Sequence, residues 1–182
     1  MIIILLANGF EEIEALYPLD ILRRLGADIK TVGINGKLIQ GAHGIEVMAD
    51  MSADEIDPDS VTHIILPGGM PGSTNLDNSP YTDKFINAVL SSHGKIGAIC
   101  AAPLVLGKRG LLNGKKAVCY PGFENYLEGA MICNDISVVT DGNITTAKGM
   151  GVALQFAKRL AEEFLGCDDQ TIDKLSKSIM EI

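Results

Sequence analysis

Short apolar runs rich in β-branched residues alternate with helical segments along the chain. The runs with the composition of buried strands are residues 2–6, 29–34, 61–66 and 96–99. The segments with helical periodicity are residues 11–25, 80–92, 151–164 and 168–177. Strands that are apolar on both faces are typical of parallel sheets, because the connecting helices cover both faces. The alternation predicts an α/β fold, a flavodoxin-like three-layer sandwich with a mostly parallel sheet between two layers of helices.

Two dipeptides that favour tight turns mark the places where the chain leaves this alternation. One hairpin is predicted over residues 38–48, shortly after Asn35-Gly36, and a second over residues 136–147, around Asp141-Gly142. The 182 residues contain no linker, internal repeat or low-complexity segment. The chain is therefore predicted to form a single domain over residues 1–182, long enough to bury a sizeable core.

Composition and charge exclude several classes of protein. Hydrophobic residues make up 47% of the chain and charged residues 21%, which is ordinary for a soluble globular protein and unlike a disordered one. The net charge is −8 and Lys and Arg do not cluster, so neither nucleic acid nor a membrane surface is an expected partner. The apolar run at residues 2–6 is too short to span a bilayer and has no basic segment before it, so it reads as a strand and not as a signal peptide.

The chain has four cysteines, Cys100, Cys119, Cys133 and Cys167. Their spacing contains no C-x-x-C motif, so neither a zinc site nor a redox dithiol is indicated. Without a secretion signal, we expect reduced thiols in a cytoplasmic protein. Cys119, Cys133 and Cys167 are predicted to be small buried hydrophobic residues.

Cys100 differs, because it lies where the strand predicted at residues 96–99 ends and a helical pattern begins. Ala98 and Ala102, two positions away on either side, are small. This is the pattern of a nucleophile elbow, a tight strand-to-helix turn that lifts one side chain above the sheet edge. The first amides of a helix carry partial positive charge, so we expect the Cys100 thiol to ionise more readily than a free thiol and to act as a nucleophile.

The first predicted helix begins with three acidic residues, Glu11, Glu12 and Glu14. Glu11 and Glu12 are expected to complement the helix dipole. Glu14 shares a stripe with Pro18 and Ile21, so its carboxyl group lies on an apolar face. Burial raises a carboxyl pKa, and a protonated Glu14 could donate a hydrogen bond to a nearby thiolate. The alternative is a half-exposed glutamate at a subunit contact.

Sites in parallel sheets form at the carboxyl ends of the strands. Three segments qualify here, namely residues 7–10, the glycine-rich loop 67–72 and the turn at Cys100. Free N–H groups of the glycine-rich loop, together with the amide of Ala101, could form an oxyanion hole. Phosphate binding is not indicated, because the sequence contains neither a P-loop nor a dinucleotide-binding motif.

A cysteine nucleophile often works with a histidine base, and the chain has three histidines. His63 lies inside a predicted strand and is expected to be a packing residue. His93 follows a helix, where it is expected to cap the helix or lie on the surface. His43, in a loop between Ala42 and Gly44, is the one histidine left as a candidate site residue.

Four segments carry a resemblance to a known family. They are Ala7-Asn8-Gly9-Phe10-Glu11-Glu12-Ile13-Glu14, Leu66-Pro67-Gly68-Gly69, Ala98-Ile99-Cys100-Ala101-Ala102-Pro103 and Thr145-Thr146-Ala147-Lys148-Gly149-Met150-Gly151. In order and over nearly the whole chain, they resemble the DJ-1/ThiJ/PfpI superfamily, in the branch of the parkinsonism-associated protein. The resemblance implies a class I glutamine amidotransferase-like fold, a homodimer, and a site that needs no metal or organic cofactor.

The resemblance also implies roles for individual residues. Cys100 corresponds to the oxidisable nucleophile and Glu14 to its protonated hydrogen-bond partner, while Gly69 and Ala101 correspond to the amide donors. His43 falls near the position where relatives present a basic residue to the partner subunit's site. Gly68 and Tyr120 are further auxiliary candidates.

The chain departs from relatives at two positions. The protease-like branch has histidine directly after the nucleophile, where this chain has Ala101, and several relatives have histidine where this chain has Tyr120 before Pro121. A phenol, with a pKa of about 10, is a poor general base near neutral pH. Amide hydrolysis by an intracellular cysteine peptidase or amidase is therefore the least favoured function.

Two functions remain open. In the first, Cys100 and Glu14 convert small reactive carbonyls as a cofactor-independent glyoxalase or deglycase. In the second, Cys100 is oxidised to a sulfinate and the protein acts as a redox sensor or chaperone without catalysis. A homodimer through the first helix is expected in either case, because Leu16 and Leu19 lie away from the stripe that faces the sheet.

Overall fold

The computed structural model describes residues 1–181 and contains a central sheet of seven strands over that range. Their order is β10-β11-β7-β6-β1-β2-β5. The bounds are β1 Ile2–Leu6, β2 Ile29–Gly33, β5 Met51–Ser52, β6 His63–Leu66, β7 Lys95–Ile99, β10 Val138–Asp141 and β11 Ile144–Ala147. All neighbouring strands pair in parallel except β10 and β11, which form an antiparallel hairpin at one edge. The predicted mostly parallel sheet is confirmed.

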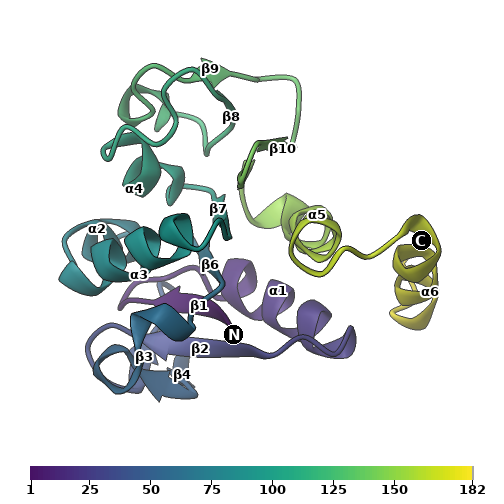
Figure 1. Ribbon diagram of the computed structural model, residues 1–182, viewed down its shortest axis with the longest axis horizontal. Helices are drawn as coiled ribbons and strands as arrows, with labels where there is room; N and C mark the ends of the chain where they lie inside the picture. The colour runs from purple at the N-terminus through teal and green to yellow at the C-terminus, as the bar shows by residue number, and fades with distance from the viewer. Residues whose placement is uncertain (182) are drawn as a thin grey trace.

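Helices cover both faces of this sheet (Figure 1). Their bounds are α1 Glu12–Arg24, α2 Gly72–Asp77, α3 Pro80–Ser91, α4 Pro103–Gly107, α5 Ala153–Leu165 and α6 Asp169–Ser178. α1 and α5 lie side by side on one face, α2, α3 and α4 lie on the other, and α6 packs outside α5 near the C-terminus (Figure 1). The molecule is the flavodoxin-like three-layer α/β sandwich that the sequence predicts.

Side chains along β1 point alternately to the two faces of the sheet, which explains why helices pack on both faces. Ile2, Ile4 and Leu6 pack with side chains of α1 and α5. Ile3 and Leu5, whose side chains point the opposite way, pack with α3 and α4. Each of these five residues is at most 5% exposed, and such burial contributes about 1.5–3 kcal/mol per large apolar side chain.

Capping residues set several helix boundaries where the sequence places them. The Ser79 hydroxyl accepts the N–H of Tyr81 at the start of α3, and the Asp168 carboxylate accepts the N–H of Thr171 at the start of α6. The boundaries of α1, α3, α5 and α6 agree with prediction to within two residues. The sequence analysis missed α2, and the second hairpin begins at Val138 instead of residue 136.

Smaller elements extend from the main sheet. Strands β3 (Leu38–Gln40) and β4 (Glu46–Met48) form the predicted first hairpin, while β8 (Lys116–Ala117) and β9 (Met131–Ile132) pair in parallel at the top of Figure 1. Single 3₁₀ turns cover Ala53–Glu55, Pro58–Ser60, Glu124–Tyr126 and Met150–Val152.

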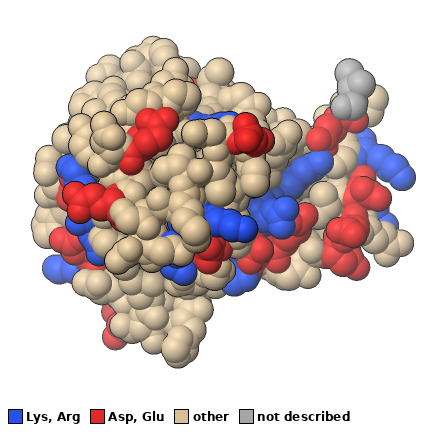
Figure 2. Space-filling model, turned by 90° about the horizontal axis from the view of Figure 1, so that it is seen from above, with Lys and Arg blue, Asp and Glu red and all other residues tan. Residues whose placement is uncertain are grey.

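The surface carries both signs of charge. On the face in Figure 2, Lys and Arg are interspersed with Asp and Glu, and the lobe formed by α6 bears both. Among the described residues, none of the helices has the length and apolar character needed to span a bilayer.

Strands β7, β6 and β1 are neighbours at the centre of the sheet and run in the same direction. Their carboxyl ends therefore bring together the three segments that the sequence analysis singles out, those after Leu6, Leu66 and Ile99. The fold places Cys100, the 67–72 loop and the first turn of α1 at one edge.

Candidate active site

Cys100 is held in the strained backbone conformation of a nucleophile elbow. Its φ angle is +64°, in the left-handed region that non-glycine residues seldom adopt. The Cys100 N–H donates to the Ala147 carbonyl at 2.9 Å, and its carbonyl accepts the Tyr120 N–H at 2.8 Å. Ala98 and Ala102 are fully buried against the turn, as predicted. The sulfur is therefore positioned by backbone bonds to two separate segments.

Glu14 reaches the sulfur from the first turn of α1. The Gly68 N–H donates to Oε2 of its carboxyl group at 2.9 Å. The Cys100 thiol and the Met150 N–H interact with the same carboxyl group and oppose the rise of its pKa. Glu14 is 1% exposed, so the alternative of a half-exposed residue is wrong. Sequence periodicity correctly placed this carboxyl group on the buried face of the helix.

Gly68 allows the carboxyl and the thiol to meet. A Cβ at this position would lie 2.5 Å from the Cβ of Cys100 and 2.5 Å from Oε2 of Glu14. Both distances are far below van der Waals contact. Any side chain on residue 68 would therefore push Cys100 and Glu14 apart.

Burial controls the acidity of both groups. Burial, with the charge of Glu11 adding to it, raises the pKa of Glu14 to about 7. Burial, the charge of ionised Glu14 and the hydrogen bond to it raise the pKa of Cys100 to about 12, against the opposing amides. The prediction of an unusually acidic thiol is wrong for the resting pair, because burial and the neighbouring Glu14 carboxylate outweigh the two backbone amides. At neutral pH the readily exchanged proton belongs to the carboxyl group.

Two backbone amides converge on the sulfur. The N–H groups of Gly69 and Ala101 both donate toward Cys100, and both lower its pKa. Gly69 has a φ angle of +87°, and a Cβ there would lie 2.4 Å from the Glu11 backbone nitrogen. The Glu11 N–H donates to the Gly68 carbonyl at 2.9 Å, which orients the peptide unit that carries the Gly69 N–H. These are the two amides that the family resemblance assigns.

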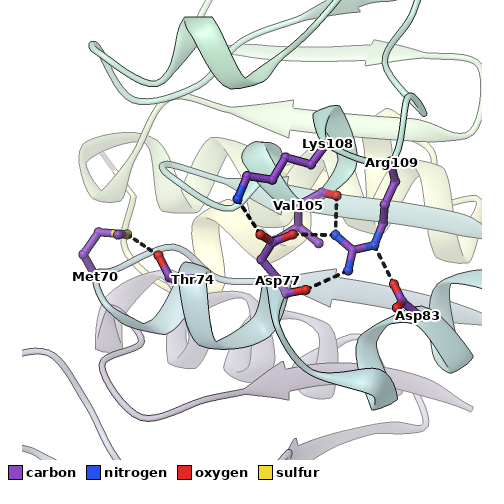
Figure 3. A network of polar contacts seen from close by, with 7 residues as sticks. All are labelled: Met70, Thr74, Asp77, Asp83, Val105, Lys108 and Arg109. Atoms are coloured by element: carbon purple, nitrogen blue, oxygen red, sulfur yellow. Dashed lines mark hydrogen bonds and ion pairs between the residues drawn. The ribbon is translucent and has the colours of Figure 1, made fainter.

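A charged network ties together the two short helices that follow these amides (Figure 3). Arg109, just after α4, donates to the Asp77 carboxylate at 2.7 Å, to the Asp77 carbonyl at 2.9 Å and to the Val105 carbonyl at 2.8 Å. Lys108 pairs with the same carboxylate at 2.6 Å, and Asp83 pairs with Arg109 at 2.7 Å. The carboxyl ends of α2 and α4 are therefore fixed relative to each other.

His43 does not supply a base to Cys100 within one chain. Its Nδ1 pairs with Oε2 of Glu12 at 2.8 Å, and its backbone N–H donates to Oε1 of Glu12 at 2.8 Å. The neighbouring Glu12 carboxylate raises the pKa of His43. Glu12 is buried, which by itself raises its pKa, but the hydrogen bonds from His43 lower it overall. Glu12 lies in the first turn of α1, as expected for a residue that complements the helix dipole, and in addition it anchors the loop that carries His43.

The other two histidines lie where the sequence analysis expects them. His63 is in β6, where its ring packs on the ring of Phe164 with 4.7 Å between the ring centroids. Its Nδ1 accepts the Lys95 N–H. His93 follows α3 and is exposed.

Glu11, Glu12 and His43 form the one group in residues 1–181 whose possible metal-ligand atoms lie within 4.8 Å of one another. Both Glu12 oxygens already accept bonds from His43, and Oε2 of Glu11 accepts the Glu14 N–H. A cation would have to displace these partners, so the cluster is explained by its own hydrogen bonds.

The remaining cysteines agree only in part with prediction. Cys119 is buried, and burial raises its pKa to about 11. Cys133 and Cys167 are half-buried, so the prediction of full burial is wrong for both. Both lie in irregular segments outside the sheet, where packing on one side only leaves part of the side chain exposed.

A cavity of about 290 Å³ lies beside this site, between residues 120–121 and 148–152. Tyr120 is one of its walls and is half exposed. The sequence analysis did not identify Met150 as a site residue, although it belongs to a segment that carries the family resemblance. Its apolar, solvent-facing side chain gave no separate signal.

Comparison with known proteins agrees with this geometry. The model of the DJ-1/PfpI family matches residues 1–163. The chain is 33% identical to protein dj-1beta of Drosophila melanogaster over 180 residues, which cover 98% of this chain and 95% of that protein. The crystal structure of Drosophila DJ-1beta superposes with a TM-score of 0.92, covering 98% of this chain and 96% of the other at 32% identity.

Two further relatives carry names that describe an activity. A glutathione-independent glyoxalase of Caenorhabditis elegans is 30% identical over 165 residues, covering 91% of this chain and 88% of that protein. A deglycase of Pyrococcus horikoshii is 31% identical over 150 residues, covering 81% and 89% respectively. The agreement extends over the sheet, the elbow and the acidic turn of α1, and the chain belongs to the DJ-1/PfpI family.

Proposed function

We propose that this protein converts small reactive carbonyl compounds through Cys100, with Glu14 as the general base and no cofactor. The observation that carries the proposal is the close approach of Cys100 to the buried carboxyl group of Glu14, whose pKa is raised to about 7. A base with a pKa near the working pH is well matched to proton transfer. The names of the nematode glyoxalase and the archaeal deglycase support the same class of substrate.

With methylglyoxal as substrate, the Cys100 sulfur attacks the aldehyde carbon while Glu14 accepts the thiol proton. The product is a hemithioacetal, and the N–H groups of Gly69 and Ala101 stabilise its developing oxyanion. Glu14 returns a proton to that oxygen. Transfer of the C1 hydrogen as a proton to C2, through an enediol, then gives a thioester of lactate. Water hydrolyses this thioester, releasing lactate and the free thiol, so the net change is the addition of one water molecule.

Deglycation joins the same route from a different substrate. Cys100 displaces the amine or thiol, which leaves with a proton, from the carbonyl-derived carbon of a hemiaminal or hemithioacetal, and this gives the same hemithioacetal on Cys100. The transfer of the C1 hydrogen to C2 then gives the thioester, and its hydrolysis releases the hydroxy acid. Both reactions need one nucleophile, one proton shuttle and one oxyanion site.

Peptide hydrolysis fits the site less well. His43 is bonded to Glu12, His63 is packed against Phe164 and His93 is exposed, so a histidine base does not face Cys100 within the chain. Ala101 and Tyr120 stand where a histidine would be needed. Expulsion of an amide nitrogen requires a strong proton donor at the leaving group, and an amide is a poorer electrophile than an aldehyde.

The decisive experiment compares wild type with Cys100→Ala. Both are incubated with methylglyoxal under reducing conditions, and lactate is measured. Lactate formed by wild type alone supports the proposal. Equal, background-level lactate from both proteins contradicts it.

A second candidate function is redox sensing. It is favoured by the two amides directed at the sulfur, which would also stabilise the negative charge of a sulfinate. Titration with peroxide followed by intact-protein mass spectrometry tests it. Gain of two oxygens at Cys100 before the other thiols react supports sensing, and earlier oxidation of Cys133 or Cys167 contradicts it.

We also propose that two copies associate through α1. Ile13 and Tyr17 on this helix are 45% and 37% exposed. Leu38 and Met48, on the hairpin whose loop bonds to Glu12 at the start of the helix, are 56% and 68% exposed. Covering these side chains would remove apolar surface from water. Sedimentation of wild type and of a Tyr17→Asp variant tests this, and a monomeric wild type at micromolar concentration contradicts it.

A further inference from the structure

The cavity beside Cys100 is open to solvent yet directly connected to the reacting groups. The Met150 N–H lowers the pKa of Glu14, and the Tyr120 N–H donates to the Cys100 carbonyl at 2.8 Å. A Cβ on Gly149 would lie 3.7 Å from Oε1 of Glu14 and 3.3 Å from Cδ2 of Tyr120. Gly149 therefore leaves open the passage between the Tyr120 ring and the Glu14 carboxyl group.

The walls of this cavity are largely apolar. They include Tyr120, Pro121, Met150 and Val152. Lys148 is the one charged residue among the lining, and its Nζ donates to the Asn134 carbonyl, which lies outside the cavity. Lys148 therefore contributes its alkyl stem and not its charge.

The two largest side chains that line the cavity are accessible to a ligand. Tyr120 is 51% exposed and Met150 is 53% exposed, so about half of each side chain remains free to contact another molecule. A flexible thioether facing an aromatic ring adapts well to flat or branched apolar groups.

We propose that this cavity binds the apolar substituent of a 2-oxoaldehyde, which makes Tyr120 and Met150 specificity-determining residues. The inference rests on the proposed function, because it assumes that the aldehyde carbon is bonded to Cys100. The substituent on C2 then extends past Gly149 into the cavity. Oxoaldehydes with an aryl or branched alkyl group are accordingly preferred over glyoxal, which has no substituent to bind.

The size of the effect follows from pocket energetics. Loss of an apolar contact in a hydrophobic pocket lowers kcat/KM by about tenfold or more. In a half-open pocket we expect a decrease near the lower limit, about tenfold. Met150→Ala should lower the ratio of kcat/KM for phenylglyoxal to that for glyoxal by about tenfold. Gly149→Ala should lower the same ratio, because the added methyl group narrows the passage. Gly149 has an extended backbone with φ of 164°, so alanine is tolerated there without backbone strain.

Steady-state kinetics of wild type, Met150→Ala and Gly149→Ala with both aldehydes test the proposal. Comparing variants by this ratio cancels the different intrinsic reactivity of the two aldehydes. Met131→Ala is the matched control, since Met131 is 51% exposed and lies in β9, away from the cavity. A lowered ratio in both cavity variants and an unchanged ratio in the control support the proposal. An unchanged ratio in the cavity variants overturns it.

A second measurement separates this inference from the proposed function. Alkylation of Cys100 by iodoacetanilide and by iodoacetamide, followed by mass spectrometry, needs no turnover. If wild type converts neither aldehyde, the proposed function fails, and alkylation still tests the cavity. A Met150→Ala variant that lowers the preference for the aryl reagent about tenfold supports the cavity as an apolar subsite. An equal preference in both proteins overturns it.

Discussion

The carboxyl group of Glu14, on a helix that covers one face of the sheet, lies beside Cys100 at the end of a central strand, and each group shifts the pKa of the other. This pair contains one nucleophile and one base with clearly separated pKa values, about 12 and about 7. The thiol remains protonated until a substrate arrives, and the carboxylate is ready to receive its proton.

The rate of carbonyl conversion should follow the ionisation of Glu14. Below pH 7 the carboxyl group is protonated and cannot accept the thiol proton, so kcat/KM should rise with pH and level off above about pH 7. Glu14→Gln should lower kcat/KM by about a hundredfold to ten-thousandfold and remove this limb of the profile. Lactate assays over a pH series check both expectations. A variant that keeps the wild-type profile would rule out Glu14 as the base.

Glu14→Gln should also change stability, and in the opposite sense from activity. The carboxyl pKa is raised from its ordinary 4.5 to about 7 in the folded state, so its contribution to stability is present below pH 4.5 and is lost as the pH rises to about 7. A difference of this size corresponds to about 3 kcal/mol. Relative to its own stability at pH 4, the variant should retain about 3 kcal/mol more than wild type above pH 7. Urea denaturation at pH 4 and above pH 7 measures this difference. An equal change in the free energy of unfolding between the two pH values in both proteins would show that the carboxyl group titrates normally.

Gly68→Ala should disable the site while leaving the sheet intact. The new methyl group would lie 2.5 Å from both the Cys100 Cβ and the Glu14 Oε2, so these groups must separate. We expect lactate formation to fall at least as far as in Glu14→Gln. Circular dichroism provides the folding control. Wild-type activity in a folded variant would show that direct contact between Cys100 and Glu14 is dispensable.

Arg109→Ala should destabilise the protein more than Lys108→Ala. Arg109 is 18% exposed, and its removal deletes bonds to the Asp77 carboxylate, the Asp77 carbonyl and the Val105 carbonyl together, a loss of about 3 kcal/mol. Lys108 is 44% exposed, and its exposed pair is worth less than about 1 kcal/mol. Denaturant titration of the two variants checks the order. Equal losses would mean that the network in Figure 3 does not hold α2 against α4.

The sequence predicts most of the framework because its signals are local. Periodicity in residues 2–6 and 11–25 identifies a buried strand and a helix, and small residues at Ala98 and Ala102 identify the elbow. Glu14 was found by the same periodicity. These predictions depend only on neighbours along the chain.

The predictions from sequence missed features that depend on tertiary contacts. α2 is six residues long and begins at Gly72 after Pro71, so it lacks any periodic signal, and its end is fixed by Arg109 from a distant segment. The acidity of Cys100 depends on how deeply the turn is buried, which no local pattern reports. Glu12 has the sequence signature of a surface residue and is buried because the loop carrying His43 covers it.

Gly68 joins the first turn of α1 through both of its backbone groups, since its carbonyl accepts the Glu11 N–H at 2.9 Å and its N–H donates to Glu14 at 2.9 Å. The first bond opens only when the start of the helix lifts away from the sheet edge, and the second opens when the Glu14 side chain turns away. The Gly68 amide should therefore exchange with deuterated solvent only when the Glu14 carboxyl group leaves the Gly68 N–H. A single slowly exchanging amide would thus report, without any substrate, whether the catalytic pair is assembled.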